Sequence, residues 1–339
     1  MTLAPVDLST NENPLGPSPR VVEAIVREAS RIHRYPARDD SALRASLADH
    51  HGRGLTPDHF FAASSASEVL DLIARSSLTP GDEAIICSPT FPVYGVTVRN
   101  NHGVLIDVPL NPETCAHDVP RILGAVTPRT RLLYLCNPGN PTGVITPAAE
   151  VRALLDGLPP DVLMVADEVY YQYVDDANFP DSIDHVHAGR PVVIVHSFSK
   201  GYAMAGLRLG YGMASPDLVG RLGRFRLTYH LSGPAQAAGV AALADREHVA
   251  RTVALTAEGR QFLIAGLTRL GVRNWPSSAN FVLTAPRDAD LALARLAEWG
   301  IQVRPIAGPG QARCLRISIG LPEDNQRVID ALASLGSLP

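Results

Sequence analysis

The sequence predicts an α/β protein with a mostly parallel, mixed sheet covered by helices, followed by a smaller α+β domain. Three observations support this fold class: apolar segments of strand length recur through the middle of the chain, amphipathic segments separate several of them, and the pattern changes near residue 245. Strands that are apolar throughout are typical of parallel sheets with both faces buried. The strand-length segments are 83–87, 104–108, 131–136, 162–166, 192–197 and 209–213.

Between these segments lie helical patterns such as TPAAEVRALLDGL over 146–158. Strands that alternate with helices form parallel βαβ units, and ligands of such folds bind at the carboxyl ends of the strands. We therefore expect the residues that follow the strands to form the functional site.

The last third of the chain has a different pattern. A long helical pattern covers 248–271 and is followed by shorter segments, which read as strand 280–283, helix 288–299, strand 315–319 and helix 322–335. At the other end, one helix near 20–31 lies between extended, Pro-rich pieces. We predict an N-terminal segment 1–40 that packs on the small domain, a large domain 41–245 and a small C-terminal domain 246–339.

Composition and charge exclude several classes of partner. The 339 residues carry a formal net charge of -4 without a basic block, which argues against nucleic acid and anionic membrane. The start of the chain has no signal-peptide pattern and no apolar run is long enough to span a membrane. Four separated cysteines, without a CxxC pair, suggest buried thiols. We expect a cytoplasmic protein with small-molecule substrates.

Lysine usage gives a sharper signal. Of the 30 Lys+Arg residues, 29 are Arg and one is Lys200. An arginine-favouring genome accounts for the arginines but not for the exception. A lysine amine can lose its proton, attack a carbonyl and form an imine, whereas arginine stays protonated. Lys200 is therefore the candidate nucleophile, and it follows the strand 192–197 at the predicted carboxyl edge.

Polar residues follow two other predicted strands. Asp167 comes directly after the strand 162–166, with Tyr170 three residues later, and Asn140 lies in the turn NPGNPTG (137–143). Each residue alone is more often a surface or core residue than a site residue. Together, a carboxylate can hold a proton on a ring nitrogen, and a phenol and an amide can bind a ring oxygen.

Other residues provide anion-binding groups. Ser197, Ser199 and Arg208 surround Lys200 in sequence, and the segment SSASE (64–68) opens a helix predicted over 66–77. Hydroxyls, a guanidinium and helix N-terminal amides are typical phosphate ligands. Arg316, in the strand 315–319, can pair in a bidentate manner with a carboxylate. This set matches the needs of pyridoxal phosphate: an amine, an acid for the ring nitrogen, a phosphate cup and a carboxylate clamp.

The chain resembles class I/II aminotransferases among the fold type I pyridoxal-phosphate enzymes, most closely the histidinol-phosphate aminotransferase branch. Motifs that carry the resemblance run through nearly the whole chain. They are NENPLGPSP (11–19), RYP (34–36), SPTFPVY (88–94), CNPGNPTG (136–143), DEVY (167–170), SFSK (197–200), GLRLGYG (206–212), YHLSGPAQAA (229–238), ANFVL (279–283), VRP (303–305) and LRISIG (315–320).

The resemblance implies a seven-stranded sheet and a role for each candidate. Lys200 binds the cofactor as a Schiff base and moves the substrate proton, Asp167 pairs with the ring nitrogen, and Tyr170 and Asn140 bind the ring oxygen. Phe91 stacks on the ring, and Arg316 clamps a substrate anion. Asn140, Tyr229 and Leu15 are the other residues expected to contact the substrate. The phosphate cup consists of Ala66, Ser67, Ser197, Ser199 and Arg208, with Tyr35 from the second subunit of a homodimer that has shared active sites.

Three departures from the family pattern stand out. Ser65-Ala66-Ser67-Glu68 replaces the usual turn beside the phosphate, which puts the backbone geometry there in question. His230 replaces an asparagine, where it either donates to a substrate phosphate or only fills space. Ala37 replaces an aspartate in the Tyr-Pro-Asp segment, without an evident consequence.

The resemblance favours transamination of histidinol phosphate with 2-oxoglutarate, in histidine biosynthesis. An aromatic amino-acid aminotransferase stays open, since Leu15, Phe91 and Tyr94 can form an apolar pocket, and so does decarboxylation of a phosphorylated amino acid on the same cofactor. A penicillin-type Ser197-x-x-Lys200 site lacks its second lysine, and a regulator would need a DNA-binding extension. The histidines of 184–187 lack convergent carboxylates, so no metal is expected.

Overall fold

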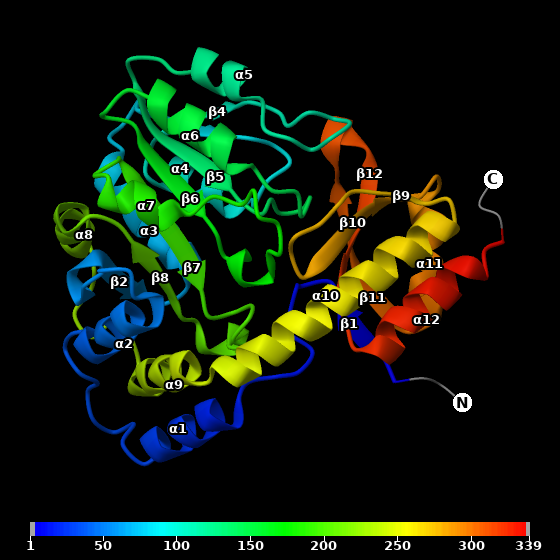
Figure 1. The fold of residues 1–339 in the computed structure, drawn as a ribbon, viewed down its shortest axis with the longest axis horizontal. Helices are drawn as coiled ribbons and strands as arrows, with labels where there is room; N and C mark the ends of the chain where they lie inside the picture. The colour runs from blue at the N-terminus through cyan, green and yellow to red at the C-terminus, as the bar shows by residue number, and fades with distance from the viewer. Residues whose placement is uncertain (1–3, 337–339) are drawn as a thin grey trace.

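The computed structural model describes residues 4–336, which form two sheets and the helices around them (Figure 1). The larger sheet has the strand order β2-β8-β7-β6-β5-β3-β4, and all pairs are parallel except the two that β8 makes with β7 and β2. Its strands are β2 Phe60–Ala63, β3 Glu83–Ile86, β4 Val104–Asp107, β5 Thr130–Cys136, β6 Leu163–Asp167, β7 Val192–Ser197 and β8 Gly210–Met213. The predicted mostly parallel sheet of seven strands is confirmed.

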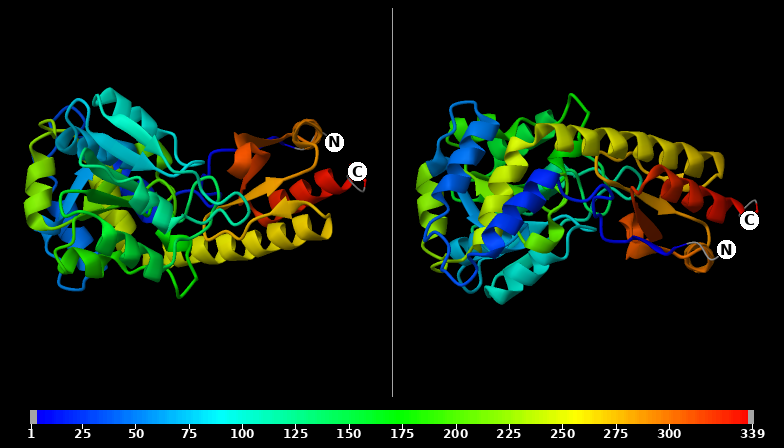
Figure 2. Two further views of the ribbon diagram at one scale, coloured as in Figure 1. Left: turned by 90° about the horizontal axis from the view of Figure 1, so that it is seen from above. Right: turned by 90° about the horizontal axis from the view of Figure 1, so that it is seen from below.

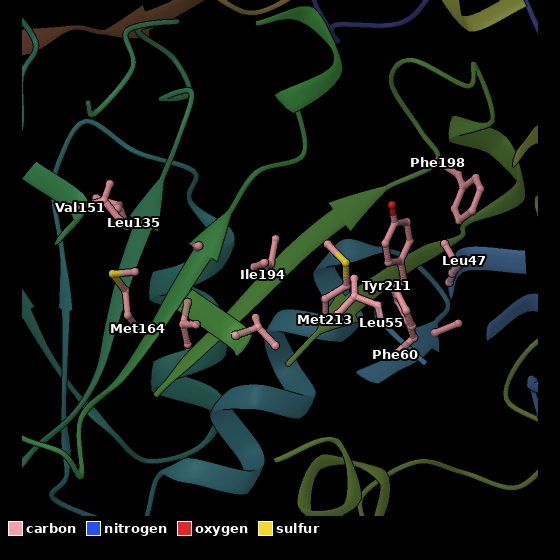
Figure 3. Close-up of a cluster of buried hydrophobic side chains, with 14 of the residues drawn as sticks. Leu47, Leu55, Phe60, Leu135, Val151, Met164, Ile194, Phe198, Tyr211 and Met213 are labelled. Atoms are coloured by element: carbon pink, nitrogen blue, oxygen red, sulfur yellow. The ribbon is translucent and has the colours of Figure 1, made fainter. Parts of the chain in front are cut away.

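Helices cover both faces of this sheet because its strands are apolar on both sides. Successive strand residues point to opposite faces, so Met164 and Ala166 join one buried cluster while Leu163 and Val165 join another. Figure 3 shows part of the first cluster, where Met164, Ile194 and Tyr211 lie along neighbouring strands. Helices α2 Ser41–His51, α5 Val119–Gly124, α6 Ala148–Gly157, α7 Ser182–His187 and α9 Gly233–Ala244 pack on the first cluster, and α3 Ala66–Ser77, α4 Val93–Asn100 and α8 Pro216–Gly223 pack on the second.

The smaller sheet has the order β1-β11-β12-β10-β9 and carries two helices on its buried side. Its strands are β1 Val6–Leu8, β9 Arg273–Asn274, β10 Phe281–Ala285, β11 Ile301–Ala307 and β12 Arg313–Ser318, and its helices are α11 Ala289–Glu298 and α12 Pro322–Ala333. A separate cluster of buried residues, which includes Leu267, Val282, Leu296 and Ile317, forms the core here.

The longest helix connects the two sheets. Helix α10, Arg246–Arg269, starts beside α9 and runs along the smaller sheet (Figure 2). Its Arg260 is buried and donates hydrogen bonds to the backbone oxygens of Tyr173 and Ala279 and to Asp175. Because Tyr173 follows the large sheet and Ala279 precedes β10, this guanidinium joins the two parts of the molecule.

The N-terminal segment divides between the two parts. Strand β1 pairs in parallel with β11 of the smaller sheet, whereas helix α1, Pro19–Ala29, packs against α9 at the large sheet. Helix α1 therefore departs from the expectation that segment 1–40 packs on the small domain. The division at residues 40 and 245 stays a proposal about domain boundaries.

The carboxyl ends of β5, β6 and β7 lie at one edge of the large sheet. Their register aligns Cys136 with Asp167 and Asp167 with Val195, so the loops after these strands start side by side. Antiparallel β8 begins next to them, with Gly210 paired to Ser197. This edge faces the smaller sheet and brings together the residues that the sequence marked.

Gly210 has no side chain, which allows helix α3 to begin close to β8. A substitution at this position therefore tests the packing at this edge of the sheet. A Cβ on Gly210 lies 2.3 Å from the backbone nitrogen of Ala66, and a backbone neighbour cannot move aside as a flexible side chain can. We expect Gly210→Ala to lower the free energy of unfolding by about 1–3 kcal/mol and to weaken cofactor binding. Thermal unfolding and a cofactor titration measure both effects.

Gly220→Ala is the matched control, since a Cβ at this position in α8 meets no atom within 4 Å. It should leave cofactor affinity unchanged and stabilise the helix slightly. Equal behaviour of the two variants would contradict the proposed role of the close approach.

Candidate active site

A cavity of about 490 Å³ opens where the carboxyl ends of the large sheet meet the smaller sheet. One group of lining residues lies at or after the ends of β2, β3, β5, β6 and β7. A second group comes from β11, β12 and the segment after β1. Charged groups are concentrated here: Lys200, Arg208, Arg304 and Arg316 face the cavity together with Asp167 and Glu12. The cavity is therefore suited to anionic ligands.

Lys200 lies at the end of β7 and is held by backbone oxygens alone. Its Nζ donates hydrogen bonds to the carbonyls of Thr10 (3.2 Å) and Asn11 (3.0 Å). Burial, together with the nearby cations Arg316 and Arg208, lowers the pKa of Lys200 to about 8, although Glu12 acts in the opposite direction. A usable fraction of the amine is therefore unprotonated near neutral pH, as an imine-forming nucleophile requires.

Asp167, the last residue of β6, is a buried acid with one strong donor. Tyr94 of α4 donates a hydrogen bond to its Oδ2 at 2.6 Å, and the ring of Tyr94 stacks on Tyr134 with centroids 4.8 Å apart. Burial raises the pKa of Asp167 to about 6, while the hydrogen bond from Tyr94 lowers it. The carboxylate is therefore ionised at neutral pH and available to a protonated ring nitrogen.

Tyr170 is placed by two amides from different parts of the chain. Its hydroxyl accepts from Asn11 Nδ2 at 3.0 Å and from Asn140 Nδ2 at 3.4 Å. Asn11 is itself fixed, because its backbone oxygen accepts from Asn280 and its backbone nitrogen donates to Ser318. The N-terminal segment thus supplies part of the site.

Arg316 on β12 is a buried cation that reaches toward the large sheet. It donates to Asn140 Oδ1 and to the backbone oxygen of Ser9, each at 2.7 Å, and its guanidinium lies 5.3 Å from the ring centroid of Phe281. Burial lowers the pKa of Arg316, and Arg304, its register partner on β11, adds to this effect. Two adjacent guanidiniums in one cavity repel each other unless an anion lies between them.

Groups suited to a phosphate lie at the opposite end of the cavity. The first residues of α3, Ala66 and Ser67, line it together with Ser197, Ser199 and Arg208. Free backbone amides at the start of a helix of 12 residues favour an anion. Ser65, in front of this helix, has φ 111° and ψ 160°, a conformation that glycine adopts far more readily than serine, so the backbone of this turn is strained.

The cavity contains most but not all of the predicted site residues. Tyr35 is 82% exposed outside it and stacks on Tyr229 with centroids 4.7 Å apart, and Leu15 is partly exposed. His230 bonds through Nε2 to the backbone oxygen of Ala62 and does not line the cavity, which favours the space-filling role. The predicted residues that do line it are Lys200, Asp167, Tyr170, Asn140, Phe91, Ala66, Ser67, Ser197, Ser199, Arg208 and Arg316.

For three residues of the site, the sequence analysis did not predict the contacts that the structure shows; Tyr94 entered it only as part of an apolar pocket. Asn11, Tyr94 and Arg304 occur within the recognised segments NENP, SPTFPVY and VRP, but nothing in these segments shows what the side chains contact. Only the fold places Asn11 beside Tyr170 and Tyr94 beside Asp167.

Comparison with known proteins agrees with this site. Residues 4–332 match the family described as aminotransferase class I and II. The chain belongs to this aminotransferase family. A protein of Symbiobacterium thermophilum named histidinol-phosphate aminotransferase is 41% identical over 98% of this chain and 91% of its own length. One with the same name from Moorella thermoacetica is 37% identical over 97% and 85%.

A solved structure has the same fold. The histidinol-phosphate aminotransferase of Sinorhizobium meliloti, in complex with pyridoxal-5'-phosphate, superimposes with a TM-score of 0.90 and 27% sequence identity over 98% of this chain and 92% of that one. The predicted enzyme class, a pyridoxal-phosphate-dependent aminotransferase of fold type I, is confirmed.

The residues of this aminotransferase fit its cofactor. An amine of lowered pKa, a buried carboxylate and a helix N-terminus with hydroxyls and a guanidinium converge on one cavity. These are the groups that a pyridine ring with an aldehyde and a phosphate requires. Within residues 4–336, no helix is long and apolar enough to cross a membrane, and no cluster of three potential metal ligands occurs.

Tyr94→Phe tests whether Tyr94 supports the Asp167 anion. Losing a hydrogen bond to a charged group costs roughly 1.5–3 kcal/mol, so the pKa of Asp167 should rise by about 1–2 units. If the acid is needed ionised, cofactor affinity, which should weaken in the wild type as the pH falls toward 6, will weaken at a higher pH in the variant. Cofactor titrations between pH 5 and 8.5 measure this.

Tyr134→Phe removes a hydroxyl from the ring stacked on Tyr94 without touching the Asp167 hydrogen bond. It should keep the wild-type dependence on pH. If Tyr94→Phe behaved in the same way as Tyr134→Phe, the hydrogen bond would have no part in holding the charge.

Proposed function

We propose that this aminotransferase transfers the amino group of histidinol phosphate to 2-oxoglutarate, as a step of histidine biosynthesis. The names of relatives with 41% and 37% identity over almost the whole chain support this substrate. The role of each site residue is part of the proposal.

The observation that carries the proposal is the pair of guanidiniums at the small-sheet side of the cavity. Arg304 and Arg316 are register partners on β11 and β12, and both line the cavity. One guanidinium suffices for a carboxylate, whereas a phosphate dianion matches two. The substrate's phosphate thus lies at this end, and its amine points toward Lys200.

The chemistry divides between the cofactor and the chain. Pyridoxal phosphate, when bound, supplies an aldehyde for amines and a ring that accepts electrons. Lys200 supplies the amine that holds the cofactor and then moves the proton at the substrate's Cα. Asp167 holds the proton on the ring nitrogen, Tyr170 and Asn140 bind the ring oxygen, and Phe91 lies against the ring.

The phosphate of the cofactor is held at the start of α3. Ala66 and Ser67 supply backbone amides and a hydroxyl, and Ser197, Ser199 and Arg208 complete the cup. Tyr229 and Leu15 lie outside the cavity of the single chain, so their proposed substrate contacts depend on movement or on a second subunit.

We also propose a homodimer with shared active sites, located in the cytoplasm. Large apolar side chains are exposed on α1 and on the segment before α9, among them Val26 at 65% and Leu227 at 74%, and Tyr35 after α1 stacks on Tyr229 of that segment. Exposed apolar surface is typical of interfaces. Four buried free cysteines suit a reducing compartment.

The substrate assignment predicts a preference that depends on phosphate. We expect kcat/KM for histidinol phosphate to exceed the values for histidinol, phenylalanine and tyrosine, each with 2-oxoglutarate. Arg304→Gln should lower the value for histidinol phosphate by about 10- to 100-fold, the loss of one charged hydrogen bond, and should affect phenylalanine less. Single-turnover kinetics with each amine alone measures the reaction of the amino donor without the contribution of 2-oxoglutarate.

Arg313→Gln is the matched control, because Arg313 lies on the same strand as Arg316 but outside the cavity, with an ion pair to Asp290. This variant should leave kcat/KM unchanged for both histidinol phosphate and phenylalanine. A higher kcat/KM for phenylalanine or tyrosine would overturn the histidinol-phosphate assignment in favour of an aromatic one, and release of carbon dioxide from a phosphorylated amino acid would overturn transamination.

The shared site predicts recovery of activity by mixing two defective variants. Lys200→Ala should be inactive, since the chain has no other lysine, and Tyr35→Ala should bind the cofactor poorly. In a mixed dimer, one site has both residues intact, so activity should reappear after subunit exchange. Steady-state assays of the mixture against each variant alone measure it.

A mixture of Lys200→Ala with Asp167→Asn is the control, because both residues line the cavity of one chain and every mixed site stays defective. Recovery in the control, or none in the test after proven exchange, would refute the contribution of Tyr35 across the interface.

A further inference from the structure

A chain of hydrogen-bonded side chains lies on the face of the large sheet opposite Tyr94. We call it the back-face chain, and it consists of Ser182, Glu168, His196, Tyr211 and His51. Glu168 follows Asp167 and therefore points to the other face of the sheet. Its carboxyl accepts a hydrogen bond from Ser182 Oγ and lies 3.4 Å from His196 Nε2. The Tyr211 hydroxyl lies 2.9 Å from both His196 Nδ1 and His51 Nε2.

The back-face chain connects three neighbouring strands where the active-site residues begin. Glu168 follows β6, His196 precedes Ser197 on β7, and Tyr211 lies on β8, in the buried cluster of Figure 3. The ring of Tyr171 stacks on His196 with centroids 3.9 Å apart. The proposed site does not account for any of these side chains.

Burial disfavours a charge on every ionisable member. It raises the pKa of Glu168 to about 8, and it lowers the pKa of His196 to about 3 and that of His51 to about 2. Asp181 also raises the pKa of Glu168, whereas the hydrogen bond from Ser182 and the nearby His185 act against burial. These directions favour a neutral hydrogen bond between Glu168 and His196 over an ion pair.

When the neutral Glu168 donates to His196, the positions of the other protons in the chain follow. Glu168 donates its proton to His196 Nε2, His196 donates from Nδ1 to the Tyr211 oxygen, and Tyr211 donates to His51 Nε2. If Glu168 ionises, His196 must donate from Nε2, and each later hydrogen bond reverses. The tautomer of His196 therefore reports whether Glu168 donates its proton to His196.

The consecutive carboxyl groups of Asp167 and Glu168 lie in different environments on the two faces of the sheet. Tyr94 donates to Asp167 and favours its anion, whereas His196 accepts from Glu168 and favours its neutral acid. A charge on Glu168 also raises the pKa of Asp167. We propose that Glu168 is a positioning residue, which the back-face chain holds as a neutral acid so that Asp167 alone carries the negative charge at the end of β6.

This inference rests on the proposed role of Asp167, and it concerns a group with several ionisable neighbours. These are Asp167 on β6, His196 on β7, Tyr211 on β8, His51 on α2, Tyr171 after β6, and Asp181 and His185 at α7. Glu168 keeps its proton in the folded protein up to a pH of about 8, but an unfolded glutamate loses it near about 4.3. The stabilising effect of this proton is complete below that lower pH and declines as the pH rises to about 8.

The decisive experiment is nitrogen NMR of the holoenzyme labelled with ¹⁵N-histidine, with His196 assigned from a His196→Asn spectrum. At pH 7, we expect neutral His196 with its proton on Nδ1, and above about pH 8 a switch to Nε2. In Glu168→Gln, the introduced amide donates to Nε2, so the proton should stay on Nδ1 at both pH values. This variant should keep kcat at pH 7 within about twofold, because it preserves the neutral donor.

Thermal unfolding of the apoenzyme gives a second reading. The melting temperature of Glu168→Gln relative to the wild type should increase between pH 5 and 8, because only the wild type has the proton to lose. Glu150→Gln on α6 replaces another carboxyl whose pKa burial raises, and it should leave the His196 signal unchanged.

Either of two results would overturn the inference: His196 protonated on Nε2 or on both nitrogens at pH 7, or a tenfold or larger loss of kcat in Glu168→Gln. A failure of the substrate assignment is distinguishable, because the NMR and unfolding measurements involve no turnover. If Glu168→Gln does not fold, the wild-type spectrum at the two pH values still decides.

Discussion

The buried negative charge of Asp167 is the constraint on which the site depends. A carboxylate with almost no solvent contact is stable only if hydrogen bonds and cations replace the lost water. Tyr94 donates to it at 2.6 Å, and the cavity that it faces contains Lys200 and three arginines. Burial, together with Arg316 and Arg208, lowers the pKa of Lys200, so the same buried cavity contains an ionised acid and a partly unprotonated amine.

The cavity requires both sheets, since neither contains the complete set of charges. The large sheet brings Asp167, Tyr170 and Lys200 to its carboxyl edge, and the smaller sheet contributes Arg304 and Arg316. Asn140 links the two, because it donates to Tyr170 and accepts from Arg316. The position of the small sheet therefore sets the distance between the reacting amine and the anion clamp.

The sequence alone allowed much of the fold and part of the site to be predicted. All six predicted strands of the large sheet exist, because each is a continuous apolar run between polar turns, and Lys200 stood out as the single lysine. Strand β2, Phe60–Ala63, was not predicted, because half of it is alanine, a residue that is depleted in strands. The hydrogen bonds of Asn11 and Tyr94 could not be predicted, because they join residues 159 and 73 positions apart in the chain.

Charge placement also distinguishes the two faces of the large sheet. At its carboxyl edge, an ionised acid and several cations surround a cavity that receives anions, so the charges are balanced when ligands bind. On the face that carries Tyr211, the buried side chains of Glu168, His196 and His51 border a second cavity, of about 410 Å³, whose lining contains no lysine or arginine, and their neutral forms satisfy the hydrogen bonds among them. Because Asp167 and Glu168 are consecutive, the pleat of β6 assigns one carboxyl to each environment. The fold, more than either side chain, thus decides which of two similar acids is charged.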